Sequence, residues 1–272
     1  MKKIILLIFV IGTCLISNAG TVDTVAIFSN SMHKSIKCVV IKPSNYARGK
    51  ARFPVVYYLH GYGGSYSNCI TRIPQLTNYA DLYKLIIVCP DGAIGSWYFD
   101  SPTDTAYRYE THISTEVVGY IDSHFKTVAD PQHRAICGLS MGGHGAMFLA
   151  LRHPAIFGAA AAMSGGMDLT DSKTQFEIAL RIGDTSTNAK YWHDWSIINL
   201  IEQYPNTPVK ILFDCGNRDI FIESNRRLHQ KMLALKIPHD YIERFGVHGW
   251  DYWRNSIPYQ LLFFRNFFNN FK

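Results

Sequence analysis

The 272-residue sequence lacks the patterns that several protein classes require. Its basic residues are scattered in runs no longer than Arg226-Arg227, so no nucleic-acid-binding stretch is present. It contains neither a GxxxxGK[ST] nor a GxGxxG pattern, which argues against a phosphate-binding loop. We find no internal repeat and no low-complexity linker. Only 18% of the residues are charged, which argues against a disordered chain.

Cysteine is scarce, and none of the six cysteines belongs to a Cys-x-x-Cys pair, so a structural zinc site is not expected. Beyond the first nineteen residues the cysteines are Cys38, Cys69, Cys89, Cys137 and Cys215. This odd number leaves at least one thiol unpaired. Three of the five lie in apolar runs, where cysteine behaves as a small buried hydrophobic residue. A disulfide framework is therefore not expected either.

The segment Met1–Ala19 has the pattern of a signal peptide. Lys2-Lys3 precedes the apolar run Ile4–Ile11, and Ser17-Asn18-Ala19 suits cleavage before Gly20. The apolar run is too short to span a bilayer, so we expect a secreted or periplasmic protein without stable membrane insertion. Two alternatives are a lipoprotein anchored at Cys14, although Gly12-Thr13 before it makes a poor lipobox, and an ordinary buried N-terminal helix.

Residues 20–272 have the length and the hydrophobic content, 47% over the whole chain, of a single large α/β domain. Thr21–Ser29 and Lys34–Lys42 alternate polar and apolar residues around a Ser-Asn-Ser turn, which predicts an antiparallel hairpin. Apolar runs typical of strands buried on both faces follow at 53–59, 85–89, 135–138, 159–163 and 209–213, with a last strand at 239–245. Helical patterns alternate with them at 113–125, 145–151, 222–235 and after Trp250. This order predicts a mostly parallel sheet with helices on both faces.

One strand is followed by Gly138-Leu139-Ser140-Met141-Gly142, the pattern of a nucleophile elbow. A serine at such a turn has strained backbone geometry, and a Cβ at Gly138 or Gly142 would collide with the neighbouring strand and helix. The serine hydroxyl is exposed beside a helix N-terminus, which favours developing negative charge. Ser140 is therefore the candidate nucleophile.

A serine nucleophile needs a base and an acid that orients the base. His248 is the best base among eleven histidines, because it lies in a glycine-flanked loop directly after the last predicted strand. For the acid we prefer Asp219 to Asp214, because Asp214 ends its strand whereas Asp219 lies further along the loop. Asp251 is a more distant alternative, since it shares the helix start that follows His248.

The loop His60-Gly61-Tyr62-Gly63-Gly64 is too rich in glycine for regular structure and also follows a predicted strand. A tetrahedral intermediate needs two N–H donors for its oxyanion, and the backbone N–H groups of Tyr62 and Met141 are the candidates. His60 is expected to make a structural hydrogen bond. Trp97, Tyr98 and Trp250, with Tyr62, are candidate aromatic walls of a substrate pocket. The weakly helical segment 167–207 is a candidate lid or specificity insertion.

These motifs occur in order across most of the chain, and together they resemble the esterase D family of α/β-hydrolases. The resemblance rests on Leu59–Gly64, Ser96-Trp97-Tyr98, Gly138–Gly143, Cys215–Asp219 and Val247–Trp253. The family includes S-formylglutathione hydrolases, tributyrin-type carboxylesterases, feruloyl and acetyl-xylan esterases, and mycolyltransferase antigens. The resemblance implies the α/β-hydrolase fold, a triad of Ser140, Asp219 and His248, and oxyanion donors at Tyr62 and Met141. Gly249 replaces an aspartate often found after the catalytic histidine.

We therefore expect a secreted serine carboxylic-ester hydrolase that forms an acyl-enzyme and needs no metal or organic cofactor. Its expected substrates are small-molecule or carbohydrate esters with feruloyl, acetyl or short-chain acyl groups. The sequence leaves two other hypotheses open. One is acyl transfer to a carbohydrate acceptor, and the other is a non-catalytic binding protein on a hydrolase scaffold.

Overall fold

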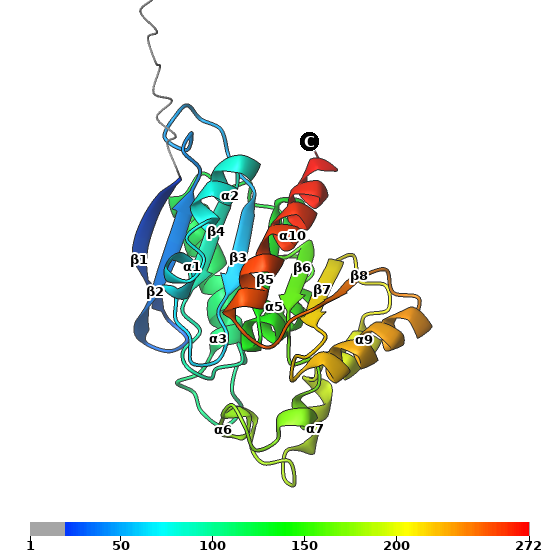
Figure 1. The fold of residues 1–272 in the computed structure, drawn as a ribbon. Helices are drawn as coiled ribbons and strands as arrows, with labels where there is room; N and C mark the ends of the chain where they lie inside the picture. The colour runs from blue at the N-terminus through cyan, green and yellow to red at the C-terminus, as the bar shows by residue number, and fades with distance from the viewer. Residues whose placement is uncertain (1–19, 272) are drawn as a thin grey trace, which may run out of the picture.

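The computed structural model describes residues 20–271, which form one eight-stranded sheet flanked by helices (Figure 1). The predicted signal peptide and Cys14 lie outside these residues. The strands are β1 (Thr21–Ser29), β2 (Lys34–Lys42), β3 (Val55–Leu59), β4 (Ile86–Pro90), β5 (Arg134–Leu139), β6 (Ala159–Met163), β7 (Lys210–Gly216) and β8 (Asp240–Arg244). Their order in the sheet is β1-β2-β4-β3-β5-β6-β7-β8.

Only the N-terminal part of this sheet is antiparallel. The predicted hairpin is present with Thr21 opposite Lys42 and Ser29 opposite Lys34, and β2 also runs antiparallel to β4. The pairs from β4 through β3, β5, β6 and β7 to β8 are all parallel. The predicted fold class, a mostly parallel sheet with an antiparallel N-terminal hairpin, is therefore confirmed.

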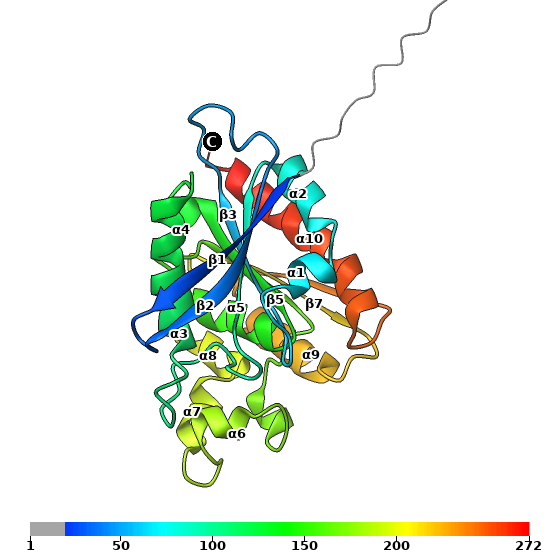
Figure 2. The same ribbon diagram turned by 90° about the vertical axis from the view of Figure 1, so that its left-hand side faces the viewer.

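Helices cover both faces of the sheet, as Figure 2 shows in a view turned by 90°. They are α1 (Asn68–Thr71), α2 (Leu76–Tyr83), α3 (Tyr109–Thr111), α4 (Val118–His124), α5 (Met141–Arg152), α6 (Ile178–Ile182), α7 (Ala189–Asp194), α8 (Ile197–Leu200), α9 (Ile222–Ala234) and α10 (Trp250–Asn269). A π-helical turn, η1 (His112–Val117), joins α3 to α4, and short 3-10 turns lie at η2 (Pro131–His133), η3 (Leu169–Ser172) and η4 (Ile201–Gln203). Within residues 20–271, no helix is both long and apolar enough to cross a membrane.

The two faces of the sheet contribute to two hydrophobic cores because side chains alternate along each strand. In β3, Val55 and Tyr57 pack into the core beneath α4, α5 and α9, whereas Val56 and Tyr58 pack into the core beneath α1, α2 and α10. Every residue of β3 is buried. This explains why the continuous apolar run predicted a central strand.

Helix α5 follows β5 directly, and its residues from Met141 to Leu151 are all buried. The carboxyl ends of β3, β5, β7 and β8 lie at the same edge of the sheet, because these strands are parallel neighbours or near neighbours. In both ribbon views α6 and α7, which belong to the segment 167–207, lie beyond this edge. Loops that follow different strands are thereby brought together with that segment.

Candidate active site

Ser140 occupies the sharp turn between β5 and α5. Its backbone has φ 54° and ψ −121°, a positive-φ conformation that a residue with a side chain adopts only when its surroundings impose it. A Cβ at Gly138 would lie 2.3 Å from the carbonyl oxygen of Gly142, and a Cβ at Gly142 would lie 2.2 Å from that of Leu59. The collisions expected from the sequence are therefore present. The turn can form only with glycine at these two positions.

His248 lies within hydrogen-bonding distance of both Ser140 and Asp219. Its Nε2 is 2.9 Å from Ser140 Oγ, and its Nδ1 is 2.9 Å and 3.0 Å from the two carboxylate oxygens of Asp219. A carboxylate can only accept, so Nδ1 carries the proton and Nε2 accepts from the serine hydroxyl. The structure thus brings together the three residues that the sequence analysis selected, from loops after β5, β7 and β8.

Asp219 is held in place by contacts other than its hydrogen bonds with the histidine. Its side chain is fully buried, and its Oδ1 accepts a hydrogen bond of 2.9 Å from the backbone N–H of Phe221. The neighbouring Arg218 donates its backbone N–H to the carbonyl of Gly246 at 2.9 Å, which joins the loop after β7 to the loop after β8. The carboxylate therefore has a defined orientation toward His248.

The two alternative acids lie elsewhere. Asp214 is buried within β7, where it accepts hydrogen bonds from Ser256 and Gln260 and lies 3.3 Å from Arg244. Burial raises the pKa of the Asp214 carboxyl, although these partners oppose the shift. The Asp251 side chain is 96% exposed and pairs with Arg254 on its own helix. Neither contacts His248.

The glycine-rich loop after β3 packs directly against the elbow. A Cβ at Gly61 would lie 2.6 Å from Leu139 Cδ1 and 3.2 Å from Ser140 Cβ. His60 holds the loop: its Nδ1 donates to the carbonyl of Gly61, and its Nε2 accepts from the backbone N–H of Gly92, both at 2.8 Å. The structural hydrogen bond expected for His60 is therefore present.

Two backbone N–H groups beside Ser140 are free to bind an anion. Those of Tyr62 and Met141 have no acceptor in the part of the chain that the structure describes. Met141 is the first residue of α5, and the first N–H groups of a helix have no intrahelical partner. The helix dipole adds positive potential at the same end. These are the two donors that the sequence analysis selected for an oxyanion.

A cavity of about 300 Å³ opens over Ser140. It is lined by Gly61–Gly64, Asn68, Arg72, Leu139, Ser140, Phe176, His248, Trp250 and Trp253. Trp250 and Tyr62 are thus at the pocket wall, as the sequence suggested. Trp253 packs edge-on against the His248 ring with 5.0 Å between centroids.

Trp97 and Tyr98 do not line this cavity, which corrects their predicted place in its wall. Both are buried and both have positive φ, which turns their rings into the core. Tyr98 fills the space behind the elbow, because a Cβ at either Gly92 or Gly145 would lie 2.4 Å from its ring. Its hydroxyl donates to the carbonyl of His60 at 2.9 Å. These aromatic residues support the site from beneath.

Phe176, which the sequence analysis did not single out, forms part of the cavity wall. It comes from the segment 167–207, and its ring packs edge-on against Tyr62 with 5.5 Å between centroids. Its carbonyl accepts a hydrogen bond of 2.9 Å from Trp97 Nε1. The only signal for it was the prediction that this segment carries specificity. Periodicity could not select one side chain from a weakly patterned segment.

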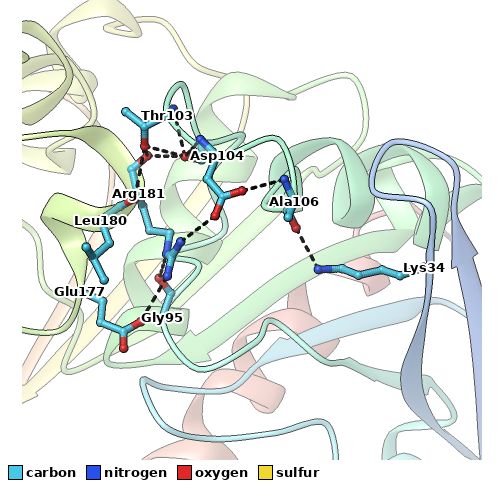
Figure 3. Close-up of polar contacts among 9 residues, drawn as sticks. Lys34, Gly95, Thr103, Asp104, Ala106, Glu177, Leu180 and Arg181 are labelled. Atoms are coloured by element: carbon cyan, nitrogen blue, oxygen red, sulfur yellow. Dashed lines mark hydrogen bonds and ion pairs between the residues drawn. The ribbon is translucent and has the colours of Figure 1, made fainter.

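Arg181 anchors α6 to the loop after β4, as Figure 3 shows. Phe176 lies two residues before the start of α6. Its Nε donates to the carbonyl of Gly95 at 3.2 Å, and its other nitrogens lie 3.4 Å from Asp104 and from Glu177. Phe176 and Glu177 both have φ 56°. This unfavourable backbone geometry is maintained by the contacts of Arg181 on one side and of Trp97 on the other.

The fold and this arrangement of serine, histidine and aspartate define an α/β-hydrolase. The esterase family model described as "Putative esterase" matches residues 29–264, so the chain belongs to this esterase family. Within residues 20–271 no three His, Cys, Asp or Glu side chains are grouped so as to hold a metal ion.

Known proteins agree with this assignment. The chain is 27% identical over 222 residues to S-formylglutathione hydrolase of Bos taurus, covering 73% of this chain and 75% of that protein. It is also 27% identical over 216 residues to acetyl esterase of Caldicellulosiruptor saccharolyticus, covering 74% and 79%. Among solved structures, a ferulic acid esterase superposes with a TM-score of 0.81 at 27% identity, covering 92% of this chain and 99% of that one. The protein is therefore a carboxylic-ester hydrolase.

Proposed function

We propose that the protein is an exported serine esterase that hydrolyses acyl esters of carbohydrates through an acyl-enzyme. The observation that carries this proposal is the continuous hydrogen-bonded series from Ser140 through His248 to the buried Asp219. A serine hydroxyl is a weak nucleophile at neutral pH, and a neutral imidazole at 2.9 Å can remove its proton during attack.

In the first step Ser140 Oγ attacks the ester carbonyl while His248 Nε2 takes the hydroxyl proton. Asp219 stabilises the imidazolium that forms. The N–H groups of Tyr62 and Met141 bind the oxyanion, and loss of one such donor typically costs roughly 3 kcal/mol of transition-state stabilisation. His248 then protonates the leaving alcohol. In the second step His248 activates a water molecule, which releases the acid and restores Ser140.

The proposed acyl groups are feruloyl, acetyl or other short acyl groups. The aromatic rings of Tyr62, Phe176 and Trp250 suit an aryl group or the face of a sugar ring. The names of the similar acetyl esterase and ferulic acid esterase support the same range. For export, the supporting observation is the N-terminal pattern Met1–Ala19, and N-terminal sequencing of the mature protein should find Gly20 first.

The nucleophile is tested with p-nitrophenyl acetate, methyl ferulate and acetylated xylan, using the wild type and Ser140→Ala. We expect the variant to lose about 10⁴-fold or more in kcat on every ester that the wild type hydrolyses, because no other hydroxyl replaces Ser140. A thermal unfolding transition like that of the wild type would show that Ser140→Ala is folded. Equal rates for the two proteins would refute the proposed mechanism. A fluorophosphonate probe should label the wild type at Ser140 and leave the variant unlabelled.

A further inference from the structure

Two hydrogen-bond donors on α1 enter the cavity beside the candidate nucleophile. Asn68 is the first residue of α1, and Arg72 follows its last residue, so the two side chains are four positions apart. The backbone N–H of Arg72 donates to the carbonyl of Asn68 at 2.9 Å, which shows that the helical turn continues to Arg72. Residues four apart on a helical turn lie on the same side of it. Both line the cavity over Ser140.

The orientation of the Asn68 amide is set by its own loop. Its Oδ1 accepts a hydrogen bond of 2.9 Å from the backbone N–H of Ser65. The oxygen is therefore occupied, and the NH₂ group is the part left over. Across residues 20–271 this NH₂ group donates to no protein acceptor. Asn68 thus presents a donor rather than an acceptor.

Arg72 contributes a positive charge with no carboxylate partner among the described residues. Its guanidinium carbon lies 5.7 Å from the centre of the Trp250 ring, which keeps the side chain over the cavity wall. No Asp or Glu is among the residues that line the cavity. By contrast, Arg226, Arg227 and Arg254, which are also surface residues, all pair with carboxylates. The entrance to the site is therefore positively charged on the side of α1.

We propose that Arg72, together with Asn68, binds a carboxylate on the substrate, so that the preferred substrates are esters of acidic compounds such as uronic acid-containing carbohydrates. A guanidinium and an amide NH₂ match an acceptor-only, planar anion. One cation balances the single charge of a carboxylate, whereas a phosphate monoester carries a charge of about −1.5 to −2. This proposal rests on the proposed function of Ser140 and names a selectivity for that site.

The test uses pairs of esters in which one member carries a carboxylate and the other a neutral group at the same position. The p-nitrophenyl monoester of glutaric acid is paired with p-nitrophenyl valerate, which places the carboxylate on the acyl side. 3-Carboxyphenyl acetate is paired with 3-carbamoylphenyl acetate, which places it on the alcohol side. Arg72→Gln removes the charge, Arg72→Lys keeps the charge without the fork geometry, and Arg254→Gln is the matched control on the surface.

We expect Arg72→Gln to raise KM about tenfold for the charged member of at least one pair, with kcat nearly unchanged, because the variant loses a charge-assisted hydrogen bond to the carboxylate. A tenfold change corresponds to about 1.4 kcal/mol. The neutral member should change less than about twofold. Arg72→Lys should be intermediate, and 0.5 M salt should reduce the preference of the wild type. Arg254→Gln should match the wild type.

Equal losses on the charged and neutral members would overturn the proposal in favour of a packing role for Arg72 against Trp250. An unchanged KM of Arg72→Gln for both pairs would also overturn the proposal. So would a rise in KM that Arg72→Gln shows only with a 3-phosphophenyl acetate. A fluorophosphonate should label Arg72→Gln at the wild-type rate, because Ser140 is unchanged in this variant. If the nucleophile assignment is wrong, Ser140→Ala will instead keep its activity and its labelling, so the two failures can be told apart.

Discussion

The triad of Ser140, His248 and the buried Asp219, here called the floor of the site, differs from the cavity wall, formed by Tyr62, Phe176 and Trp250, in how its residues are anchored. Each floor residue lies a few positions after a strand of the sheet, in a loop whose backbone is hydrogen-bonded to a neighbouring loop or strand. The wall residues come from a glycine-rich loop, from the segment 167–207 and from a helix start.

In the proposed mechanism this difference separates the catalytic chemistry from the choice of substrate. The parallel sheet determines the positions of the floor residues, so their geometry depends on the core of the domain. The wall residues lie outside the strands, so substitutions there can change the cavity without altering the sheet. A fold of this kind can therefore retain one reaction while its substrates change.

The largest effect should come from replacing the acid of the floor. Asp219→Asn keeps the shape of the side chain but cannot hold the imidazole in the same way, so we expect kcat to fall about 10⁴-fold. Steady-state hydrolysis of p-nitrophenyl acetate measures this loss. Asp214→Asn is the matched control, because Asp214 lies within β7, the strand that leads to Asp219, and does not contact His248. Its kcat should change only a few-fold, and similar losses in both variants would contradict the assignment of Asp219.

A second prediction concerns His144, which joins α5, the helix that begins beside Ser140, to the segment 167–207. His144 lies in α5 and its Nε2 donates to the carbonyl of Trp195 at 2.9 Å. Burial lowers the pKa of His144 from 6.5 to about 4. In the unfolded chain the imidazole takes up a proton as the pH falls through 6.5, whereas in the folded protein it stays neutral to about pH 4. Stability is therefore lost as the pH falls through this interval.

Between pH 7 and pH 5 this histidine should lower the free energy of unfolding by about 2 kcal/mol. His144→Gln can keep the hydrogen bond to Trp195 but cannot titrate. Between pH 7 and pH 5 its free energy of unfolding should therefore fall by about 2 kcal/mol less than that of the wild type. Urea unfolding at the two pH values measures the difference. His193→Gln changes a largely exposed histidine and should behave as the wild type. An identical pH dependence for His144→Gln and the wild type would show that His144 is not responsible.

The smallest effect is expected at the wall. Phe176→Ala removes a ring that packs against Tyr62 in the cavity, so kcat/KM for methyl ferulate should fall about tenfold relative to p-nitrophenyl acetate. Leu180→Ala is the control, since Leu180 lies in the same insertion with 62% of its surface exposed. A proportional loss on both esters would mean that Phe176 supports the floor rather than selecting the acyl group.

Most of the fold and the whole floor could be predicted from the sequence. Alternating and continuous apolar runs predicted the strands, and the strands predicted which loops would meet. Asp219 could be preferred to Asp214 because the predicted strand ended at Asp214 and Asp219 lay further along the loop. In the structure β7 continues to Gly216, so Asp214 lies within the strand.

The wall was harder to predict because the direction of a side chain depends on local backbone geometry. Trp97 and Tyr98 lie in a loop after a strand, as expected of pocket residues, but their positive φ angles turn both rings into the core. Phe176 also has a positive φ angle, at a position where neither a glycine nor the periodicity of the sequence indicates one. Arg72 lies on a short helix whose contact with the site arises only from long-range packing.

The five described cysteines are free, are each at most 1% exposed, and lie in five different elements. These are Cys38 in β2, Cys69 in α1, Cys89 in β4, Cys137 in β5 and Cys215 in β7. A thiol reagent can reach each one only when its own element opens. The rates of alkylation at the five positions, resolved by mass spectrometry, would therefore report the local opening free energies of the strands beneath the floor and of the helix that carries Asn68.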